Sequence, residues 1–223
     1  MNLTKKYKYK KKTITKKSIN HNRTFQSNKT FQSKYNKPGG SGVIPTTIYK
    51  NNLLFLFGRE GKYDTDNAKL FSDIGGGVDK GETYMDTAIR ESVEEMTGFL
   101  GSYEDMRKLL KKTYQINYQS RGHKPYRTHI FKYPYDEYLP KYYNNNHIFL
   151  EKKLDKSLLK TSKIFEKDKL QWFSIEDLKK TKHLFKTWYR NIIDIILKNQ
   201  NNIKKFVQQG NHCRTVKLRL HKP

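Results

Sequence analysis

Three glutamates spaced to meet on one side of a helix are the residues in this sequence best suited to chemistry. Glu91, Glu94 and Glu95 stand at positions i, i+3 and i+4, which are neighbours on a helix. Like charges this close repel one another. A hard divalent cation reverses that cost, because it takes carboxylate oxygens together with oxygens of a substrate phosphate. The alternative is an ordinary acidic surface helix, which is what three glutamates alone would indicate.

The glutamates lie on a predicted helix that follows a glycine-rich loop. Gly75, Gly76 and Gly77 let the backbone turn tightly and approach a ligand closely. Thr83 is the predicted N-cap, and Asp86 completes a capping-box arrangement. The buried side of the helix is predicted from residues that recur at helical spacing, namely Met85, Ala88, Ile89, Ser92, Val93 and Met96. Gly98 is predicted to end the helix as its C-terminal cap.

The regular spacing extends beyond the helix. Five residues separate Gly76 from Glu82, seven separate Glu82 from Arg90, and the glutamates follow Arg90 directly. This pattern closely resembles the signature box of the Nudix hydrolases, G-x5-E-x7-R-E-U-x-E-E-x-G-U. The sequence departs from the box at two positions. Ser92 stands where the family prefers an aliphatic residue, and Gly98 comes one residue late.

The resemblance implies a role for each box residue. Glu91, Glu94 and Glu95 would be metal ligands for Mg²⁺ or Mn²⁺, and Glu94 would serve either as a ligand or as the general base. Glu82 and Arg90 would form an ion pair that braces the loop against the helix.

Residues outside the box are further candidates. The family commonly uses one more carboxylate, for which Glu166 is the first candidate and Glu137 the second; a plain surface position is the alternative for both. Arg127 and His129 share one face of the strand predicted at residues 126–133. Either one of them contacts a substrate phosphate, or both line a solvated sheet face.

The order of predicted elements indicates an α/β fold. Beyond the box helix, the patterns predict strands at residues 42–49, 53–57, 70–74, 114–118, 126–133 and 171–173, and helices at residues 103–111 and 140–155, after Ser174, and around residues 188–199. The run at 53–57 is apolar on both faces, which is typical of a central strand. This order is similar to the Nudix α/β/α sandwich with a mixed sheet, and the resemblance spans roughly residues 41–200.

Charge divides the chain into three parts. The net charge is +25; residues 1–40 carry 12 Lys/Arg and residues 211–223 carry 4, with no acidic residue in either. Residues 41–210 hold the other 30 basic residues and all 21 acidic ones, a net charge of +9. We therefore expect a basic, disordered arm at 1–40, a Nudix domain at 41–210 and a basic tail at 211–223. Such charge indicates a polyanionic partner, nucleic acid first and anionic membrane second.

The arm and the single cysteine bear on partner and location. Aromatic residues are spread among the lysines of the arm, which suits RNA; the alternative is a solvated targeting or solubility tail. Cys213 is the only cysteine, so no disulfide framework is expected. No apolar run reaches the ~18 residues of a spanning helix. We expect a soluble, cytoplasmic protein with no membrane span.

Taken together, the chain looks like the mRNA-decapping Nudix enzymes of large DNA viruses, the poxvirus and giant-virus type. That resemblance implies cleavage of capped mRNA to 7-methyl-GDP and 5′-monophosphate RNA, in the host cytoplasm. One alternative keeps the enzyme and changes the substrate to a diphosphoinositol polyphosphate or a dinucleoside polyphosphate. The other is an RNA-binding protein on an inactive Nudix scaffold, and the presence of every box glutamate argues against it.

Overall fold

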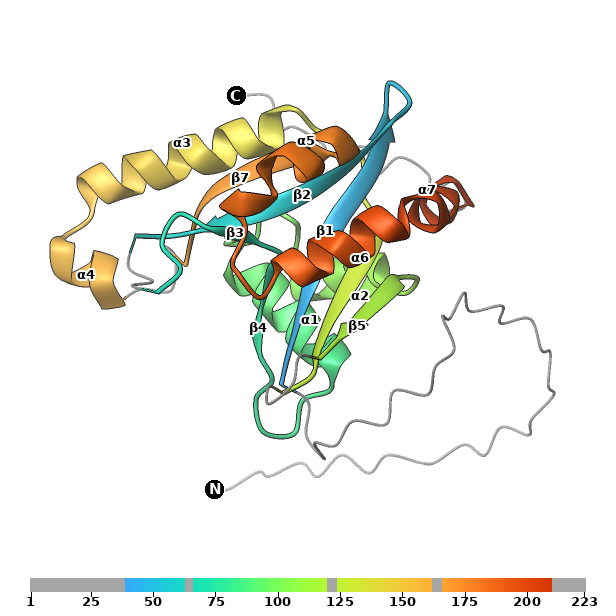
Figure 1. Cartoon of the computed structure of the whole chain (residues 1–223). Helices are drawn as coiled ribbons and strands as arrows, with labels where there is room; N and C mark the ends of the chain where they lie inside the picture. The colour runs from blue at the N-terminus through green and yellow to red at the C-terminus, as the bar shows by residue number, and fades with distance from the viewer. Residues whose placement is uncertain (1–38, 63–65, 120–123, 162–165, 210–223) are drawn as a thin grey trace, which may run out of the picture.

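The computed structural model describes residues 39–62, 66–119, 124–161 and 166–209 (Figure 1). The arm expected at residues 1–40 lies outside the described residues up to residue 38, and so does the tail expected at 211–223. Within the described ranges, no helix is both long enough and apolar enough to cross a membrane.

A mixed seven-stranded sheet forms the middle layer. Five strands pair side by side in the order β3 (Phe71–Ser72), β2 (Asn52–Glu60), β1 (Gly40–Tyr49), β6 (Tyr126–Lys132) and β5 (Tyr114–Tyr118). Two more strands extend it, because β4 (Ile74–Gly77) pairs with the start of β1 and β7 (Lys167–Ser174) pairs with β2. Only β1 and β6 are parallel among these pairs. The apolar run at 53–57 lies in β2, an inner strand as predicted.

Helices cover both faces of the sheet, as the expected three-layer α/β fold requires. One face packs against α1 (Tyr84–Glu94), α2 (Tyr103–Leu109) and α3 (Tyr138–Lys153). The other packs against α5 (Ile175–Thr181), α6 (Arg190–Lys198) and α7 (Gln200–Gln209). The short α4 (Lys156–Thr161) follows α3. Figure 1 shows α6 and α7 in front of the sheet and α1 behind it. Alternate residues of β2 point to the two layers, since Phe55 and Phe57 join one core and Leu56 the other.

The N-terminus of α1 is capped as the sequence predicts, but its C-terminus is not. Thr83 and Asp86 form a complete capping box. The helix ends at Glu94, four residues before Gly98. The extra residue is absorbed in the exit turn, where Thr97 has φ +47° and Gly98 has φ +78°, and the Gly98 N–H donates to the carbonyl of Val93 at 3.0 Å. Because the irregularity lies after the glutamates, their helical register is unchanged.

Gly75, Gly76 and Gly77, which were predicted as a loop, lie in β4; we call β4 and the turn that leads from it to α1 the glycine loop. A buried carboxylate fixes the start of this segment. Asp73 lies between β3 and β4, is 1% exposed, and accepts hydrogen bonds from the Tyr126 hydroxyl (2.9 Å) and the Thr128 hydroxyl (2.8 Å) of β6. Only a glycine fits at position 42 beside it, since a Cβ there would lie 2.6 Å from an Asp73 oxygen. Burial raises the pKa of Asp73 to about 6, against its two hydrogen bonds.

This raised pKa predicts a pH-dependent loss of stability. The folded protein binds the Asp73 proton more tightly than the unfolded chain, so this contribution is full at low pH and is lost as pH rises through 6. Asp73→Asn keeps the shape and removes the titration. From pH 4.5 to pH 7.5 we expect the free energy of unfolding of the wild type to fall by about 2 kcal/mol relative to the variant, measured by urea unfolding. Parallel pH curves for the two proteins would contradict the assignment.

Candidate active site and metal centre

Three carboxylates meet beside the glycine loop. Glu91 and Glu95 come from α1 and Glu166 from the residue before β7, and one oxygen of each lies within 4.8 Å of the others. Glu91 and Glu95 are buried and Glu166 is half-buried. We call this group the three-carboxylate cluster. Its donors are all hard oxygens at close range, so it fits a hard divalent cation such as Mg²⁺ or Mn²⁺.

Glu94 lies outside this cluster. Its side chain is 32% exposed, and its carboxylate is 3.4 Å from Nη1 of Arg90. The structure thus divides the three box glutamates, with Glu91 and Glu95 turned toward the sheet and Glu94 toward solvent. Glu137 is also not a member of the cluster, because it is exposed at the start of α3. Of the two carboxylates proposed outside the box, the structure brings Glu166 to the site.

The Arg90 guanidinium connects the loop to the helix. Its Nε and Nη2 donate to the two oxygens of Glu82 at 2.8 and 3.0 Å, and Nη2 also donates to the carbonyl of Gly77 at 3.0 Å. Its Nη1 donates to Oε1 of Glu91 at 2.8 Å. The hydrogen bonds from Arg90 hold the pKa of Glu82 at about 2, so this carboxylate stays ionised. One side chain therefore braces the loop and orients a member of the cluster.

The glycines of the loop approach the protein's own carboxylates. The Gly75 N–H donates to Oε2 of Glu95 at 2.8 Å. A Cβ at Gly76 would lie 2.4 Å from Oε1 of Glu91, so a larger residue has no room there. The sequence indicated a close backbone approach in this loop, and the structure shows that the glutamates of α1 occupy the space.

A buried lysine, which the sequence analysis missed, lies behind the cluster. Lys167 is fully buried, with Nζ 3.4 Å from Oε1 of Glu95 and 2.5 Å from Oε1 of Glu60. Lys186 also contacts Glu60, at 2.6 Å. Burial alone would lower the pKa of Lys167, but the carboxylates of Glu95 and Glu60 outweigh it and raise the pKa above its ordinary value. A fixed positive charge therefore stands against Glu95.

Even with Lys167 nearby, the surroundings of the cluster make ionisation of its carboxyl groups unfavourable. Burial raises the pKa of Glu95 to about 8, even with Lys167 beside it, and burial also raises the pKa of Glu91. Neighbouring carboxylates add to both shifts. Burial and neighbouring carboxylates thus make ionisation of both acids less favourable, and such an electrostatic environment favours a bound cation.

Arg127 and His129 have different surroundings. His129 is 1% exposed, its Nδ1 lies 3.2 Å from the hydroxyl of Thr113, and burial lowers its pKa to about 4. His129 therefore does not line a solvated sheet face, as one prediction had it. In this structure it is also not accessible for contact with a substrate phosphate, as the other prediction had it. Arg127 is half-buried; its guanidinium lies 4.5 Å above the ring of Tyr84, the first residue of α1. A substrate contact by Arg127 stays a prediction.

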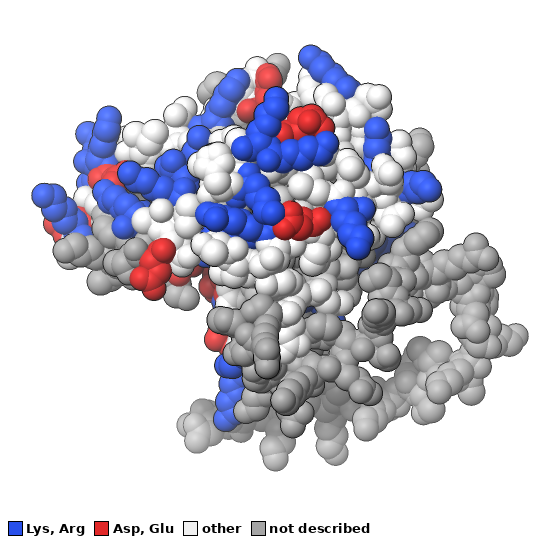
Figure 2. Space-filling view, viewed as in Figure 1, with Lys and Arg blue, Asp and Glu red and all other residues white. Residues whose placement is uncertain are grey.

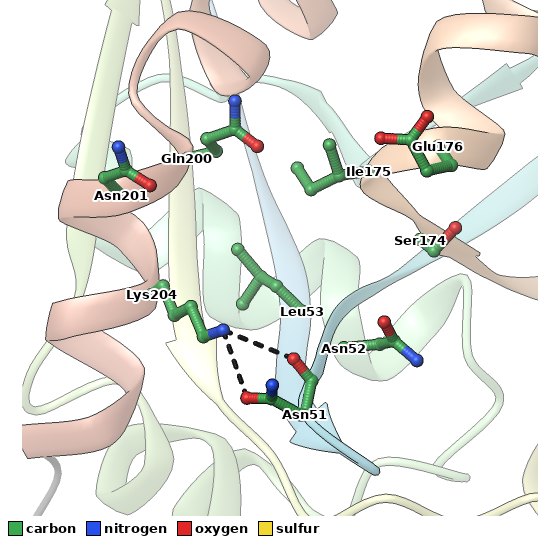
Figure 3. Close-up of a pocket in the computed structure, with 9 residues that line it drawn as sticks. All are labelled: Asn51, Asn52, Leu53, Ser174, Ile175, Glu176, Gln200, Asn201 and Lys204. Carbon is green, nitrogen blue, oxygen red and sulfur yellow. Dashed lines mark hydrogen bonds between the residues drawn. The ribbon is translucent and has the colours of Figure 1, made fainter.

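A hollow of about 330 Å³ opens at the other end of β1 from the glycine loop (Figure 3). It is lined by Asn51, Asn52, Leu53, Ser174, Ile175, Glu176, Gln200, Asn201 and Lys204. Lys204 reaches across it to Asn51, with Nζ 3.3 Å from the side-chain oxygen. With a single carboxylate in its lining, this hollow lacks the ligand set of the three-carboxylate cluster.

Comparison with solved structures finds distant likenesses. An Ap4A hydrolase from C. elegans in a binary complex is 16% identical, with coverage of 74% of this chain and 98% of that one and a TM-score of 0.46. The Nudix hydrolase RenU from M. smegmatis is 12% identical, covering 74% and 88%, with a TM-score of 0.48. A bifunctional NMN adenylyltransferase/ADP ribose pyrophosphatase from Francisella tularensis is 15% identical, covering 75% and 43%, with a TM-score of 0.48. Likeness this distant says nothing about the substrate.

Comparison with curated proteins gives no match. Comparison with protein families matches residues 43–194 to the NUDIX domain, and this match includes the glycine loop, α1 and all three members of the cluster. Because the match covers well over half of the 223 residues, the chain belongs to the Nudix hydrolase superfamily.

Proposed function

We propose that this Nudix pyrophosphohydrolase cleaves the triphosphate bridge of the mRNA 5′ cap, releasing 7-methyl-GDP and 5′-monophosphate RNA. The proposal places the chain with the decapping Nudix enzymes of large DNA viruses. Water adds across one phosphoanhydride bond: its oxygen joins phosphorus, the bridging oxygen leaves with the other product, and one proton is released. Capped mRNA carries both a dense triphosphate and a long polyanionic body. The triphosphate suits the three-carboxylate cluster with its cation, and the polyanionic body suits the basic charge of the chain.

The residues of the site divide the work. Arg90 orients Glu91, and Lys167 holds Glu95 against the N–H of Gly75. A divalent cation bound by the cluster would offset the negative charge of the phosphates and make water more acidic. A carboxylate then accepts the proton of the attacking water, and Glu166 and Glu94 are the two candidates for this general base.

The observation that carries the proposal is where the basic arm joins the domain. Residues 1–38 contain 12 Lys/Arg and connect directly to Gly39. The carbonyl of Gly39 accepts a hydrogen bond from the Val78 N–H of the glycine loop at 3.3 Å, and Gly40 pairs with Gly77 in the sheet. The positive chain is therefore attached beside the loop that lies against the cluster. A substrate that extends away from the site as a polyanion suits this placement better than a small nucleotide does.

Of the predictions for the proposed function, the first concerns turnover and substrate choice. Glu94→Gln and Glu95→Gln should each lower cap cleavage by at least about 100-fold and leave RNA binding unchanged. The assay follows labelled 7-methyl-GDP released from capped RNA with Mg²⁺ or Mn²⁺, beside free cap dinucleotide, Ap4A, ADP-ribose and a diphosphoinositol polyphosphate. Glu104→Gln, an exposed glutamate of α2, is the matched control. Cleavage of the small anions alone would refute decapping, and near-normal activity of both variants would refute the metal site.

The second prediction separates the two carboxylates outside the box. Glu166→Gln should lower kcat by about 100-fold or more, because it removes either a cluster member or the general base. Glu137→Gln changes an exposed glutamate outside the cluster, so its kcat should equal that of the wild type. Steady-state cleavage of capped RNA at saturating Mn²⁺ measures both. Equal losses in the two variants would show that the cluster does not identify the working carboxylate.

The third prediction concerns the arm. Deletion of residues 1–38 should weaken RNA binding and flatten its dependence on salt, because every phosphate that the arm neutralises contributes about 0.7 to the logarithmic salt slope of a single strand. Affinity for a labelled RNA is measured over a range of KCl concentrations. The catalytic domain should keep its cleavage of free cap dinucleotide. An unchanged salt slope would show that the arm does not bind RNA.

A further inference from the structure

The outer side of α3 carries an unusual amount of exposed apolar surface. Nine large hydrophobic side chains are exposed in the described part of the chain, and five of them lie on α3 and α4: Tyr138, Tyr142, Ile148, Phe149 and Leu158. The helix does not need this surface for packing, because its inner side already buries Leu139, Tyr143 and His147. Apolar patches of this kind mark interaction sites in soluble proteins.

The exposed rings form a row with a regular geometry. Tyr138, Tyr142 and Phe149 stand at i, i+4 and i+11, so they share one side of the helix, and they are 49%, 63% and 58% exposed. The rings of Tyr138 and Tyr142 are stacked at 28°, with centroids 5.9 Å apart. Nζ of Lys141 lies 4.8 Å from the centre of the Tyr138 ring. Flat aromatic faces and an ammonium group are thus presented together to solvent.

Most of the charged side chains along the row are basic. Lys141, Lys152 and Lys153 are exposed on α3, whereas its one acidic residue, Glu151, is paired with Lys62. Glu137, the residue just before the helix, interacts with the Tyr138 hydroxyl, so the basic part of the row runs from Lys141 onward. Figure 2 shows Lys and Arg side chains spread over the upper half of the visible face, which includes the region where Figure 1 places α3. This charge suits a polyanion.

We propose that Tyr138, Lys141, Tyr142 and Phe149 form a docking surface for single-stranded RNA, on which bases of the transcript body stack. We call it the α3 platform. Every nucleobase has a flat face that stacks on an aromatic ring, and lysines beside the rings contact the phosphates, so such a surface binds without sequence preference. This inference rests on the proposed function in one respect, namely that the RNA is the body of the capped substrate.

The inner side of the same helix contacts the candidate active site. The Tyr143 hydroxyl donates to the carbonyl of Glu95 at 2.8 Å and lies 3.0 Å from the carbonyl of Lys167. Asn144 pairs with the backbone of Leu170, accepting from its N–H at 2.7 Å and donating to its carbonyl at 3.2 Å. RNA on the platform is therefore held by a helix that is anchored to both segments bearing the cluster.

The test measures RNA binding without turnover. Fluorescence anisotropy of a labelled, uncapped oligouridine of roughly 16 nucleotides is recorded in EDTA with the full chain. Tyr142→Ala and Tyr138→Ala should each weaken binding about tenfold, and the loss should persist at raised salt because stacking is not screened. Tyr103→Ala is the matched control, since this tyrosine of α2 is 46% exposed and lies outside the platform; it should bind as the wild type does.

A second probe separates stacking from charge. Inorganic polyphosphate carries the charges without the bases, so the tyrosine variants should bind it as tightly as the wild type. Unchanged oligouridine affinity in both variants would overturn the proposal, and so would an equal loss for oligouridine and polyphosphate. A dimer of the wild type that Tyr142→Ala dissolves, with RNA affinity unchanged, would assign the platform to a second copy of the chain instead. Because the probe has no cap, the binding result tests the α3 platform even if the protein does not cleave capped RNA.

Discussion

Three carboxylates lie within 4.8 Å of one another, and their closeness determines how the charges around the site are arranged. Their mutual repulsion would open the site unless fixed positive charge stood nearby. Arg90 supplies it on the loop side and Lys167 on the sheet side. Each cation is itself held by a second carboxylate, Glu82 for Arg90 and Glu60 for Lys167. The cluster is therefore the centre of a larger arrangement of alternating charges that spans α1, β2 and β7.

The sequence predicted the part of this arrangement that is local. The helix α1 and the closeness of Glu82 and Arg90 follow from spacings within one stretch of chain, where helical periodicity fixes which side chains meet. Gly75, Gly76 and Gly77, which were expected in a loop, lie in strand β4, because they pair with β1. The pairing of Lys167 with Glu60 joins residues 107 positions apart, and it depends on the register between β2 and β7. Nothing in the composition around Lys167 marks it as buried, because lysine is almost always a surface residue.

Other differences between prediction and structure also have physical causes. Helical spacing placed all three box glutamates on one side of α1, but only Glu91 and Glu95, four apart, reach under the loop, while Glu94 is rotated toward solvent. His129 was expected at an accessible face from strand alternation alone, which says which side a residue points to and not what covers that side. One helix was expected around residues 188–199, where α6 lies, and α7, which follows it, was not predicted.

The buried charges behind the site also constrain how this protein can change over generations. When Glu95 is ionised, Glu60 and Glu95 supply two negative charges, and Lys167 and Lys186 supply two positive ones, in a space with little solvent. Replacing any one of them leaves an unbalanced charge, which costs several kcal/mol, whereas exchanging a whole pair for apolar residues is often neutral. Lineages that diverge from this chain should therefore lose or keep these positions in pairs. At these positions, we therefore expect evolution to preserve the balance of charge rather than the individual amino acids.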